Sequence, residues 1–522
     1  MHASLRALIG IVCIGTGATV VAAPPIVFTT DEAFDAATVP AYAGKHDAIY
    51  AHIDAHVPQH LAELQRWVRQ PSVSAQNRGV REMAELLAAD LRSLGFRDVA
   101  LVPTAGHPGV FGFYDAGAAR TLVVYMMYDV QPEETGWQVG AFDGALVETE
   151  HGRVLLARGA TNQKGPQRAF LNGVASILAV EGTLPVNLYV VAEGEEELGS
   201  PHFGEVINAY RDRLAQADGV LFPFNSQAPT GEVSFDLGVK GNVVFELEAR
   251  GNPSGGPQRA EIHSSLKAIV DAPAWRLVQA LATLTSPDGN DILVPGFYDA
   301  IRPPTIDEQR LVNAMAKDAA AREAAMRKSL AVDRFVDGAT GRDLIARHLF
   351  TTTLNINGLW SGYTGAGMKT ILPHVATARI DVRLVPDQTP DAQLALVRAH
   401  LDAKGFADVA VRKLAGYPPA QTPLDAPLVT TAISVFNKWG HVPKVAPRLA
   451  GSAPYYVFTD WLKLPNLSVG LGHGSGAHAP NEYMVIEPTP GSGVAGLADV
   501  EKFYVDVLFA MAHAEGASTD GR

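Results

Sequence analysis

Apolar segments of strand length alternate with segments of helical periodicity through the first half of the chain. Residues 53–67 and 80–94 repeat apolar side chains at helical spacing, and residues 121–130 form a nearly continuous apolar run. A third helical segment at 165–180 leads to another apolar run at 185–192. Strands that are apolar on both faces are typical of a parallel sheet covered by helices on both sides. The alternation therefore predicts an α/β fold with a mainly parallel sheet.

The pattern changes at the Gly-Asn-Pro-Ser-Gly-Gly-Pro segment that begins at Gly251. A helix at 272–284, a charged helical stretch at 307–330 and a strand at 351–357 follow, and residues 377–384 alternate polar with apolar side chains. A chain of 522 residues exceeds what one hydrophobic core usually serves. We therefore expect a smaller α+β domain, for use as a lid or in dimerisation, inserted into the larger one. The predicted division is a signal peptide at 1–22, the large domain at 23–250 and 416–522, and the inserted domain at 251–415.

Residues 1–22 have the pattern of a secretory signal peptide. Arg6 precedes an apolar run that ends at Val21, and this run is too short for a membrane-spanning helix. We expect cleavage after Ala22 and a periplasmic or secreted protein. Cys13 is the only cysteine and lies inside this segment, so the mature chain would have no disulfide and no thiolate metal site.

The charge of the chain argues against two classes of partner. Lys and Arg number 42 against 55 Asp and Glu, which gives a net charge of −13, and no basic stretch interrupts this excess. Nucleic acids and anionic membranes attract basic surfaces. We therefore expect no nucleic-acid partner, and no membrane partner once the signal peptide is removed.

Four short polar segments stand at or near the ends of predicted strands, where open α/β sheets bind ligands. They read Met-Tyr-Asp-Val-Gln-Pro from Met127, Arg-Gly-Ala-Thr-Asn-Gln-Lys-Gly-Pro from Arg158, Glu-Gly-Glu-Glu-Glu-Leu-Gly-Ser from Glu193 and Gly-Ala-His-Ala-Pro-Asn-Glu-Tyr from Gly476. Their positions predict one shared site.

Taken in order, the four segments resemble those of the co-catalytic zinc peptidases and amidohydrolases. This is the family of carnosinase, aminoacylase, glutamate carboxypeptidase and succinyl-diaminopimelate desuccinylase, and the resemblance covers nearly the whole mature chain. It implies a two-zinc site that hydrolyses a small amide. It also implies that Asp129 orients a metal ligand, that Glu196 is the general base, and that Glu197 and His478 are metal ligands.

Three positions that hold metal ligands in that family carry other residues in this chain. Met127 stands at the position of a ligand His, and Asn162 at that of the Asp that bridges both metals. Phe224 falls at the position of a ligand Asp, with Pro223 as the alternative alignment. Two zinc ions bring a charge of +4, which the family offsets with three carboxylates, whereas here Glu197 alone offers −1. Uncompensated charge in a partly buried pocket costs several kcal/mol, so the sequence predicts that no two-zinc site forms.

A single zinc ion is the alternative to a metal-free pocket. Glu197, His478 and the Asn162 carbonyl could supply the three protein ligands that catalytic zinc sites use. Asn is a weak zinc donor, and Met127 would suit copper(I) better. We therefore expect no cofactor, with one weakly bound zinc as the alternative.

The family's substrate-recognition residues are matched more closely. Arg383 matches an arginine whose planar guanidinium grips a substrate carboxylate. His263 matches a histidine of the inserted domain that reaches the pocket of a partner subunit and steadies the oxyanion, and Asn355 and Ser452 match pocket-lining positions. The resemblance thus implies a homodimer through the inserted domain and a small amino-acid or dipeptide ligand.

Structural roles are the alternative for several of these residues. A lone histidine such as His263 is more often a satisfied structural residue, and Arg383 could pair with Asp381. Lys164 is predicted to be a structural ion-pair partner, and Glu195 to face solvent. Because the four segments match in order, we favour function for His263 and Arg383.

Three functions are compatible with these residues. The first is an atypical hydrolase that acts through Glu196 on a dipeptide or N-acyl amino acid with a free carboxylate. Without metal its water would keep a pKa near ~15.7 instead of about 7, so hydrolysis should be slow. The second is metal-free acid–base chemistry, such as proton abstraction, elimination or acyl transfer, in which repulsion between Glu196 and Glu197 raises one pKa. The third is a non-catalytic binder of peptides, over which we favour an enzyme of the metallopeptidase and amidohydrolase class.

Overall fold

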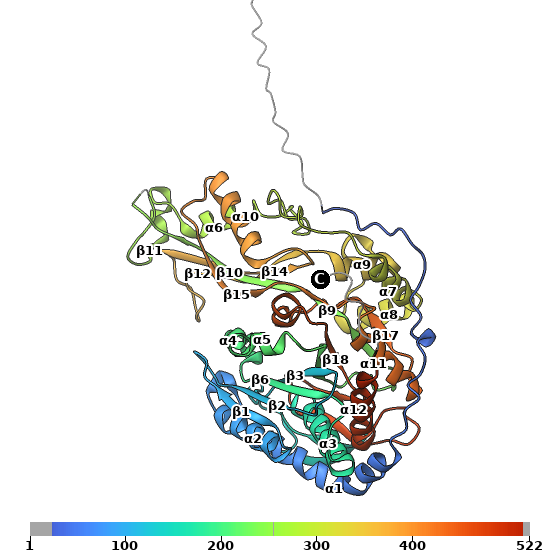
Figure 1. The fold of residues 1–522 in the computed structure, drawn as a ribbon. Helices are drawn as coiled ribbons and strands as arrows, with labels where there is room; N and C mark the ends of the chain where they lie inside the picture. Colours follow the sequence, from blue (N-terminus) through green and yellow to red (C-terminus); the bar gives the residue numbers. More distant parts are fainter. Residues whose placement is uncertain (1–22, 254, 515–522) are drawn as a thin grey trace, which may run out of the picture.

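The central sheet of the larger lobe has six strands in the order β1-β2-β6-β3-β7-β18 (Figure 1). Strands β6, β3, β7 and β18 run parallel, and β2 and β1 add an antiparallel edge. Their bounds are β1 Arg97–Val102, β2 Gly109–Tyr114, β3 Thr121–Met127, β6 Asn187–Glu193, β7 Gly219–Pro223 and β18 Asn466–Val469. The computed structural model describes residues 23–253 and 255–514, so the predicted signal peptide at 1–22 lies outside the described residues. The predicted α/β fold with a mainly parallel sheet is confirmed.

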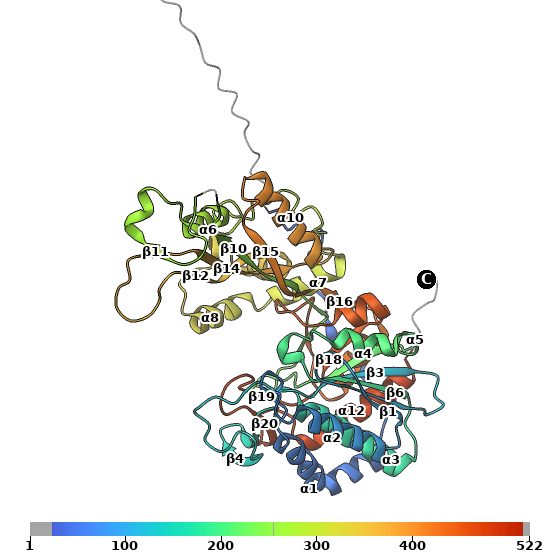
Figure 2. The ribbon, with the colours of Figure 1, turned by 90° about the vertical axis from the view of Figure 1, so that its left-hand side faces the viewer.

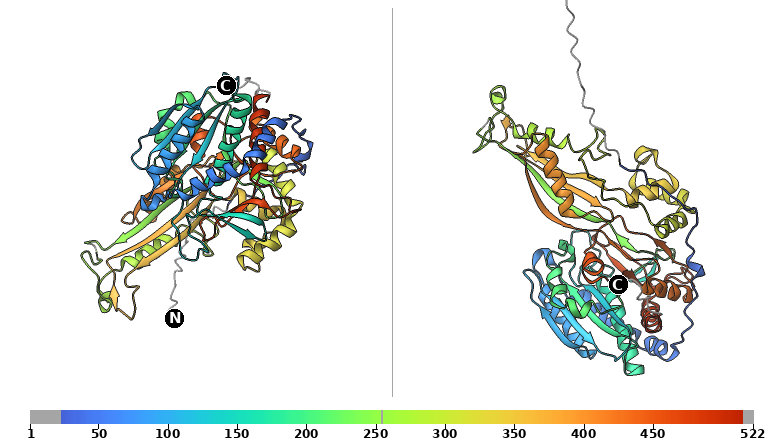
Figure 3. Two further views of the ribbon diagram at one scale, coloured as in Figure 1. Left: turned by 90° about the horizontal axis from the view of Figure 1, so that it is seen from below. Right: turned by 45° about the horizontal axis from the view of Figure 1, so that its top comes forward.

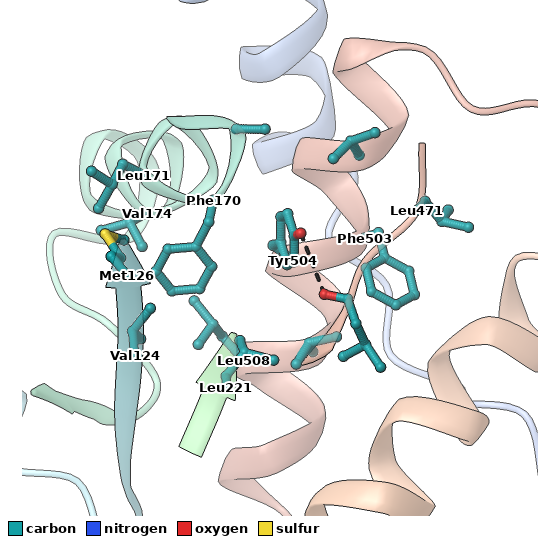
Figure 4. Packing of buried hydrophobic residues seen from close by; sticks show 14 of the residues in the cluster. Val124, Met126, Phe170, Leu171, Val174, Leu221, Leu471, Phe503, Tyr504 and Leu508 are labelled. Atoms are coloured by element: carbon teal, nitrogen blue, oxygen red, sulfur yellow. Dashed lines mark hydrogen bonds between the residues drawn. The ribbon is translucent and has the colours of Figure 1, made fainter. Parts of the chain in front are cut away.

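Helices cover both faces of this sheet, because the side chains of β3 alternate between two apolar layers. Val124 and its even-numbered neighbours pack with α1, α2, α3, α11 and α12, where the rings of Phe170 and Tyr504 lie 5.5 Å apart (Figure 4). The odd-numbered side chains, including Met127, pack with α4, α5 and a π-helical turn. The bounds are α1 Asp47–Arg69, α2 Val80–Ser93, α3 Lys164–Glu181, α4 Phe203–Ala209, α5 Arg211–Leu214, the π-helical turn Val457–Leu462, α11 Pro427–Lys438 and α12 Leu497–Ala512.

The second lobe is built on an antiparallel sheet in the order β12-β14-β10-β15, which lies apart from the first sheet (Figure 2). Strand β14 alternates as predicted: Ile380 and Val382 are buried beneath α6 and α10, while Arg379 and Arg383 lie on the opposite face. The bounds are β10 Gly241–Arg250, β12 Thr353–Ser361, β14 Val375–Leu384, β15 Ala410–Tyr417, α6 Pro273–Leu281 and α10 Pro390–Ala403. This sheet is the inserted α+β unit that the sequence predicts.

The inserted sheet begins earlier than the predicted boundary at 251. Strand β10, Gly241–Arg250, pairs with both β14 and β15, so it is an inner strand of the inserted sheet and not part of the large domain. The chain therefore passes from the large domain into the inserted domain near Gly241, before the glycine-rich segment. The helices α7 Ile306–Ala316, α8 Ala319–Leu330 and α9 Gly341–Phe350, coloured yellow in Figure 3, form a further group in which α9 packs on both α7 and α8, and α7 contacts strand β17.

Shorter strands form one further sheet and three two-stranded pairs among the described residues. A four-stranded antiparallel sheet has the order β19-β20-β5-β4, and three two-stranded pairs are β8 with β17, β9 with β16 and β11 with β13. Their bounds are β4 Ala145–Thr149, β5 Gly152–Leu156, β8 Ser234–Asp236, β9 Gly238–Val239, β11 Ile262–His263, β13 Ile371–Leu372, β16 Ala420–Gln421, β17 Lys444–Ala446, β19 Gly474–Ser475 and β20 Tyr483–Pro488. Within residues 23–253 and 255–514, no helix combines the length and apolar character that a bilayer crossing requires.

Candidate active site

Asp129 fixes the backbone that carries the two predicted catalytic glutamates. It follows strand β3 and is fully buried. Its carboxylate accepts hydrogen bonds from the backbone N–H groups of Glu196 and Glu197, both at 3.1 Å, and from the Ser74 hydroxyl at 2.7 Å. Burial raises the pKa of Asp129 to about 7, with a smaller contribution from Glu197. Asp129 therefore orients the turn after β6.

The Glu197 carboxylate is surrounded by polar side chains from three other segments. Asn162 donates from Nδ2 to Oε1 at 2.7 Å, and Gln131 donates from Nε2 to Oε2 at 2.8 Å. His478 places Nε2 3.1 Å from Oε2 and 3.1 Å from the Asn162 amide nitrogen. The predicted grouping of Glu197, Asn162 and His478 is thus present, and Gln131 is a member that sequence reasoning missed. Hydrogen-bond donors of the chain itself therefore stabilise the negative charge of Glu197.

The Glu196 carboxyl differs from its neighbour in having no hydrogen-bond donor among the described residues. Burial, and then the charges of Glu197 and Asp129, raise its pKa to about 8. The predicted repulsion between the two glutamates is present, but burial is the larger cause. A carboxyl whose pKa is raised above neutral pH and that has no hydrogen-bond partner can give its proton or, once ionised, take one back.

Two tyrosines that sequence reasoning missed lie within electrostatic range of Glu196. Tyr417 ends strand β15 of the inserted sheet, and burial, followed by the Glu196 charge, raises its pKa to about 12. Tyr455 is buried against β18, where its hydroxyl lies 2.9 Å from that of Ser468, and its pKa is raised by burial and then by Glu196. Both phenols therefore stay protonated near Glu196 and can donate hydrogen bonds there.

Glu482 holds the loop that presents Asn162. Its fully buried carboxylate accepts from the Arg158 guanidinium at 3.0 Å and from the backbone N–H groups of Gly159, Thr161 and Asn162 at 2.8–2.9 Å. The sequence placed this residue in a motif but assigned it no role. Four donors on one buried carboxylate make it the anchor of the loop.

Replacing Glu482 with alanine should lower the free energy of unfolding by about 3–5 kcal/mol, because it leaves the buried Arg158 charge without a partner. Urea unfolding followed by circular dichroism measures this loss. The matched control is Glu487→Ala, which removes a surface carboxylate, paired with Arg153, from the strand β20 that follows Glu482 and should cost about 1 kcal/mol or less. Equal losses in the two variants would show that Glu482 does not anchor the loop.

Two predicted environments are wrong. Lys164 is fully buried but forms no ion pair with any described residue: its ammonium donates to the backbone carbonyls of Trp67 and Gln70 at the end of α1, and burial lowers its pKa to about 7. Glu195 does not face solvent. It is buried and accepts from the His107 N–H at 3.2 Å, and it lies 2.7 Å from Nδ1 of His202.

Arg383 and Ser452 are brought together across the junction of the two lobes. The Arg383 Nη1 donates to the Ser452 hydroxyl at 2.9 Å, and Nε donates to Asp381 at 3.0 Å, which is the pairing given above as the structural alternative. The side chain remains 36% exposed. Nη2 has no partner among the described residues, so it can still meet a carboxylate.

Asn355 and His263 do not join this group within one chain. Asn355 is exposed on β12 and bonds only to Asn357 among the described residues. His263 lies on β11 at the far end of the inserted lobe, where its Nδ1 is 2.8 Å from the Ser265 hydroxyl (Figure 1). Its predicted role in the pocket of a second subunit stays a prediction.

Comparison with known proteins identifies the family. Residues 123–500 match peptidase family M20/M25/M40. The chain belongs to this family. Among M20-like relatives, Cys-Gly metallodipeptidase DUG1 of Candida albicans is 26% identical over 82% of this chain and 91% of that protein. Beta-Ala-His dipeptidase of Rattus norvegicus is 28% identical over 73% of this chain and 79% of that protein.

Solved M20 structures share the whole architecture. The M20 family metallo-carboxypeptidase Sso-CP2 from Sulfolobus solfataricus superposes with a TM-score of 0.75 and 30% identity over 87% of this chain and 98% of that one. Human carnosine dipeptidase 1 gives a TM-score of 0.68 and 25% identity over 89% and 98%. The resemblance drawn from the four segments is confirmed.

M20 peptidases typically bind two zinc ions, and the side chains of this member do not fit that pair. Met127 is 2% exposed in the apolar layer of α4, and Phe224 directly follows β7, with its backbone N–H bonded to the Tyr504 hydroxyl. Among the described residues, no three His, Cys, Asp or Glu side chains converge as a metal-binding group. Glu197 and His478 are the two conventional zinc donors at this position, and both already contact Asn162. Two donors, one of them charged, do not offset the charge of two zinc ions.

Proposed function

We propose that this M20-family protein binds a dipeptide or N-acyl amino acid by its free carboxylate and acts on it through Glu196 without a zinc pair. The relatives named above include Cys-Gly and Beta-Ala-His dipeptidases, which supports a small amide as the ligand. Arg383 supports the assignment of a free carboxylate on the ligand. Ser452 and Asp381 orient its guanidinium, and its Nη2 remains available to bind a carboxylate.

The observation that carries the proposal is the set of partners on Glu197. Asn162, Gln131 and His478 converge on one carboxylate at 2.7–3.1 Å, so the residue at a metal-ligand position is stabilised by hydrogen bonds from the chain. Two zinc ions would have to displace these three donors, and Glu197 would then be the one carboxylate that offsets their charge. A pocket built this way favours metal-free operation, and a single weak zinc on Glu197, His478 and Asn162 is the alternative.

The chemistry that the chain itself supplies is proton transfer. Glu196 can accept a proton, and Tyr417 and Tyr455 can hold a developing negative charge by donating hydrogen bonds. Such a set suits proton abstraction, elimination or acyl transfer on an amino-acid derivative as well as slow hydrolysis. Non-catalytic capture of peptides, the remaining alternative, would keep Arg383 and His263 for binding and need no proton transfer.

Replacing Arg383 with alanine should weaken binding of N-acetyl-alanine by about tenfold to a hundredfold, because it removes hydrogen bonds to a charged group. Binding of N-acetyl-alanine amide should be weak to wild type and unchanged by the substitution. Isothermal titration calorimetry measures both. Arg379→Ala is the matched control, since Arg379 lies on the same face of β14 but pairs with Glu246. Equal affinity of wild type for acid and amide would contradict the carboxylate grip.

Metal analysis of the purified protein tests the other half of the proposal. About one tightly bound zinc per chain would overturn the metal-free pocket. The predicted export and the predicted homodimer remain proposals, which cell fractionation and the mass of the protein in solution would test.

A further inference from the structure

A cavity of about 120 Å³ has Phe224 in its lining. Its lining residues come mainly from strands β8, β9, β16 and β18 and from the segment around the start of the π-helical turn. Phe224, Ala453 and Tyr455, which belong to or adjoin the candidate active site, are among its lining residues. None of the motif residues predicted from the sequence as ligands or catalytic groups lines it, so it is separate from the Glu197 group.

The cavity contains polar side chains that the chain leaves unpartnered. Ser226 is 7% exposed and its hydroxyl has no hydrogen-bond partner among the described residues, and the same holds for the side-chain oxygen of Asn466, which is 5% exposed. Buried polar atoms in native proteins nearly always have a partner. Two orphans that line one cavity indicate a ligand or ordered water between them.

Asp236 gives the cavity its charge. It ends β8 and, among the described residues that line the cavity, is the one ionisable acid or base besides the phenol of Tyr455. No donor in the described part of the chain bonds to its carboxylate, and burial raises its pKa to about 6, which the more distant Arg322 only partly opposes. A carboxylate, an amide oxygen and a hydroxyl together form an acceptor-rich site, whose complement is a group with several N–H donors and a positive charge.

The cavity is adjacent to the groups that are proposed to hold and act on the ligand. Ala453 lines the cavity, and the preceding residue Ser452 bonds to Arg383. Tyr455 lines the cavity, and the charges of both Glu196 and Asp236 raise its pKa, so both acids lie within electrostatic range of its hydroxyl. The residues that orient Arg383 are therefore continuous along the chain with the lining of the cavity.

We propose that this cavity is a subsite for a primary ammonium group, which Asp236, Ser226 and Asn466 accept. The carboxylate end rests on the proposed function, and the ammonium end is independent of it. A site with an anionic grip at one end and a cationic grip at the other selects zwitterions with free termini, such as unblocked dipeptides, over N-acylated amino acids.

The test compares alanyl-alanine with N-acetyl-alanine on the full mature chain by calorimetry. Asp236→Asn, which keeps the shape of the side chain, should weaken alanyl-alanine at least about tenfold and leave N-acetyl-alanine unchanged. Ser226→Ala should weaken alanyl-alanine by a few-fold. Asp460→Asn is the matched control, because it removes a carboxylate from the adjacent π-helical turn outside the cavity lining.

The outcomes separate the two ideas. If Asp236→Asn binds alanyl-alanine as tightly as wild type, the ammonium subsite is wrong and the cavity holds water only. If Arg383→Ala leaves both ligands unaffected while Asp236→Asn still weakens alanyl-alanine, the carboxylate grip is wrong and the subsite stands. Circular dichroism of each variant confirms that it is folded, and n-propylammonium, which has no carboxylate, should bind to wild type and not to Asp236→Asn.

Discussion

Restoring the three missing donors, as Met127→His, Asn162→Asp and Phe224→Asp together, should raise zinc affinity by about a hundredfold or more. Zinc content after gel filtration should approach two ions per chain. The physical reason is charge: the two introduced aspartates add two carboxylates to that of Glu197, which leaves the ions with the donors that the family supplies. Inductively coupled plasma mass spectrometry measures the bound metal.

The three substituted positions differ in burial, so the control variant must change the same three positions. Phe224 is 36% exposed and tolerates a carboxylate, whereas Met127 is buried in the apolar layer beneath α4, so a histidine there should cost stability. Met127→Leu, Asn162→Ser and Phe224→Leu together change the same three positions without adding donors and should bind no more zinc than wild type. A folded triple variant that takes up no extra zinc would show that the alignment or the geometry assumed for these positions is wrong, with Pro223 as the alternative to Phe224.

Replacing Glu196 with glutamine should lower turnover by about 10²- to 10⁴-fold, the range expected for loss of a general base. The amide keeps the size of the side chain but cannot accept a proton, so ligand affinity should stay within a few-fold of wild type. Asp129 bonds to the backbone of residue 196 and not to its side chain, so the substitution should leave this hydrogen bond and the turn that it orients unchanged. Steady-state kinetics on dipeptides and acylated amino acids, together with calorimetry, separates the two quantities.

The control for this substitution is Glu134→Gln, an exposed acid on the loop that follows β3. It removes the same charge at the rim of the site and should leave turnover unchanged. If Glu196→Gln retains full activity, the reaction depends on another group. If wild type binds ligands but turns none over, the protein is a binder, and Glu196 has no catalytic role to lose.

Periodicity predicted the sheet well because it reports burial directly. The apolar run at 121–130 became β3, and its alternate side chains fill two layers. The boundary at 251 was wrong because β10, with Glu246 and Glu248 on one face, has the pattern of a half-buried strand in either lobe. Only its pairing with β14 and β15 shows which sheet contains it.

Motif order predicted which segments meet, but not what each side chain does there. Glu197, Asn162 and His478 converge as expected. Gln131 was missed because a glutamine two residues after Asp129 carries no ligand chemistry of its own. Glu195 was misplaced because three consecutive glutamates show no sign of which one turns inward.

Met127 and the partners of Glu197 have a consequence for how the protein folds. In a metalloenzyme the carboxylates of the site repel one another until the ion arrives, so stability depends on metal supply. Here a thioether extends the apolar layer to the end of β3, and amides stabilise the remaining carboxylate by hydrogen bonds. If the pocket is metal-free, as proposed, the larger lobe should reach its native state without zinc, with its folding thermodynamically uncoupled from that ion.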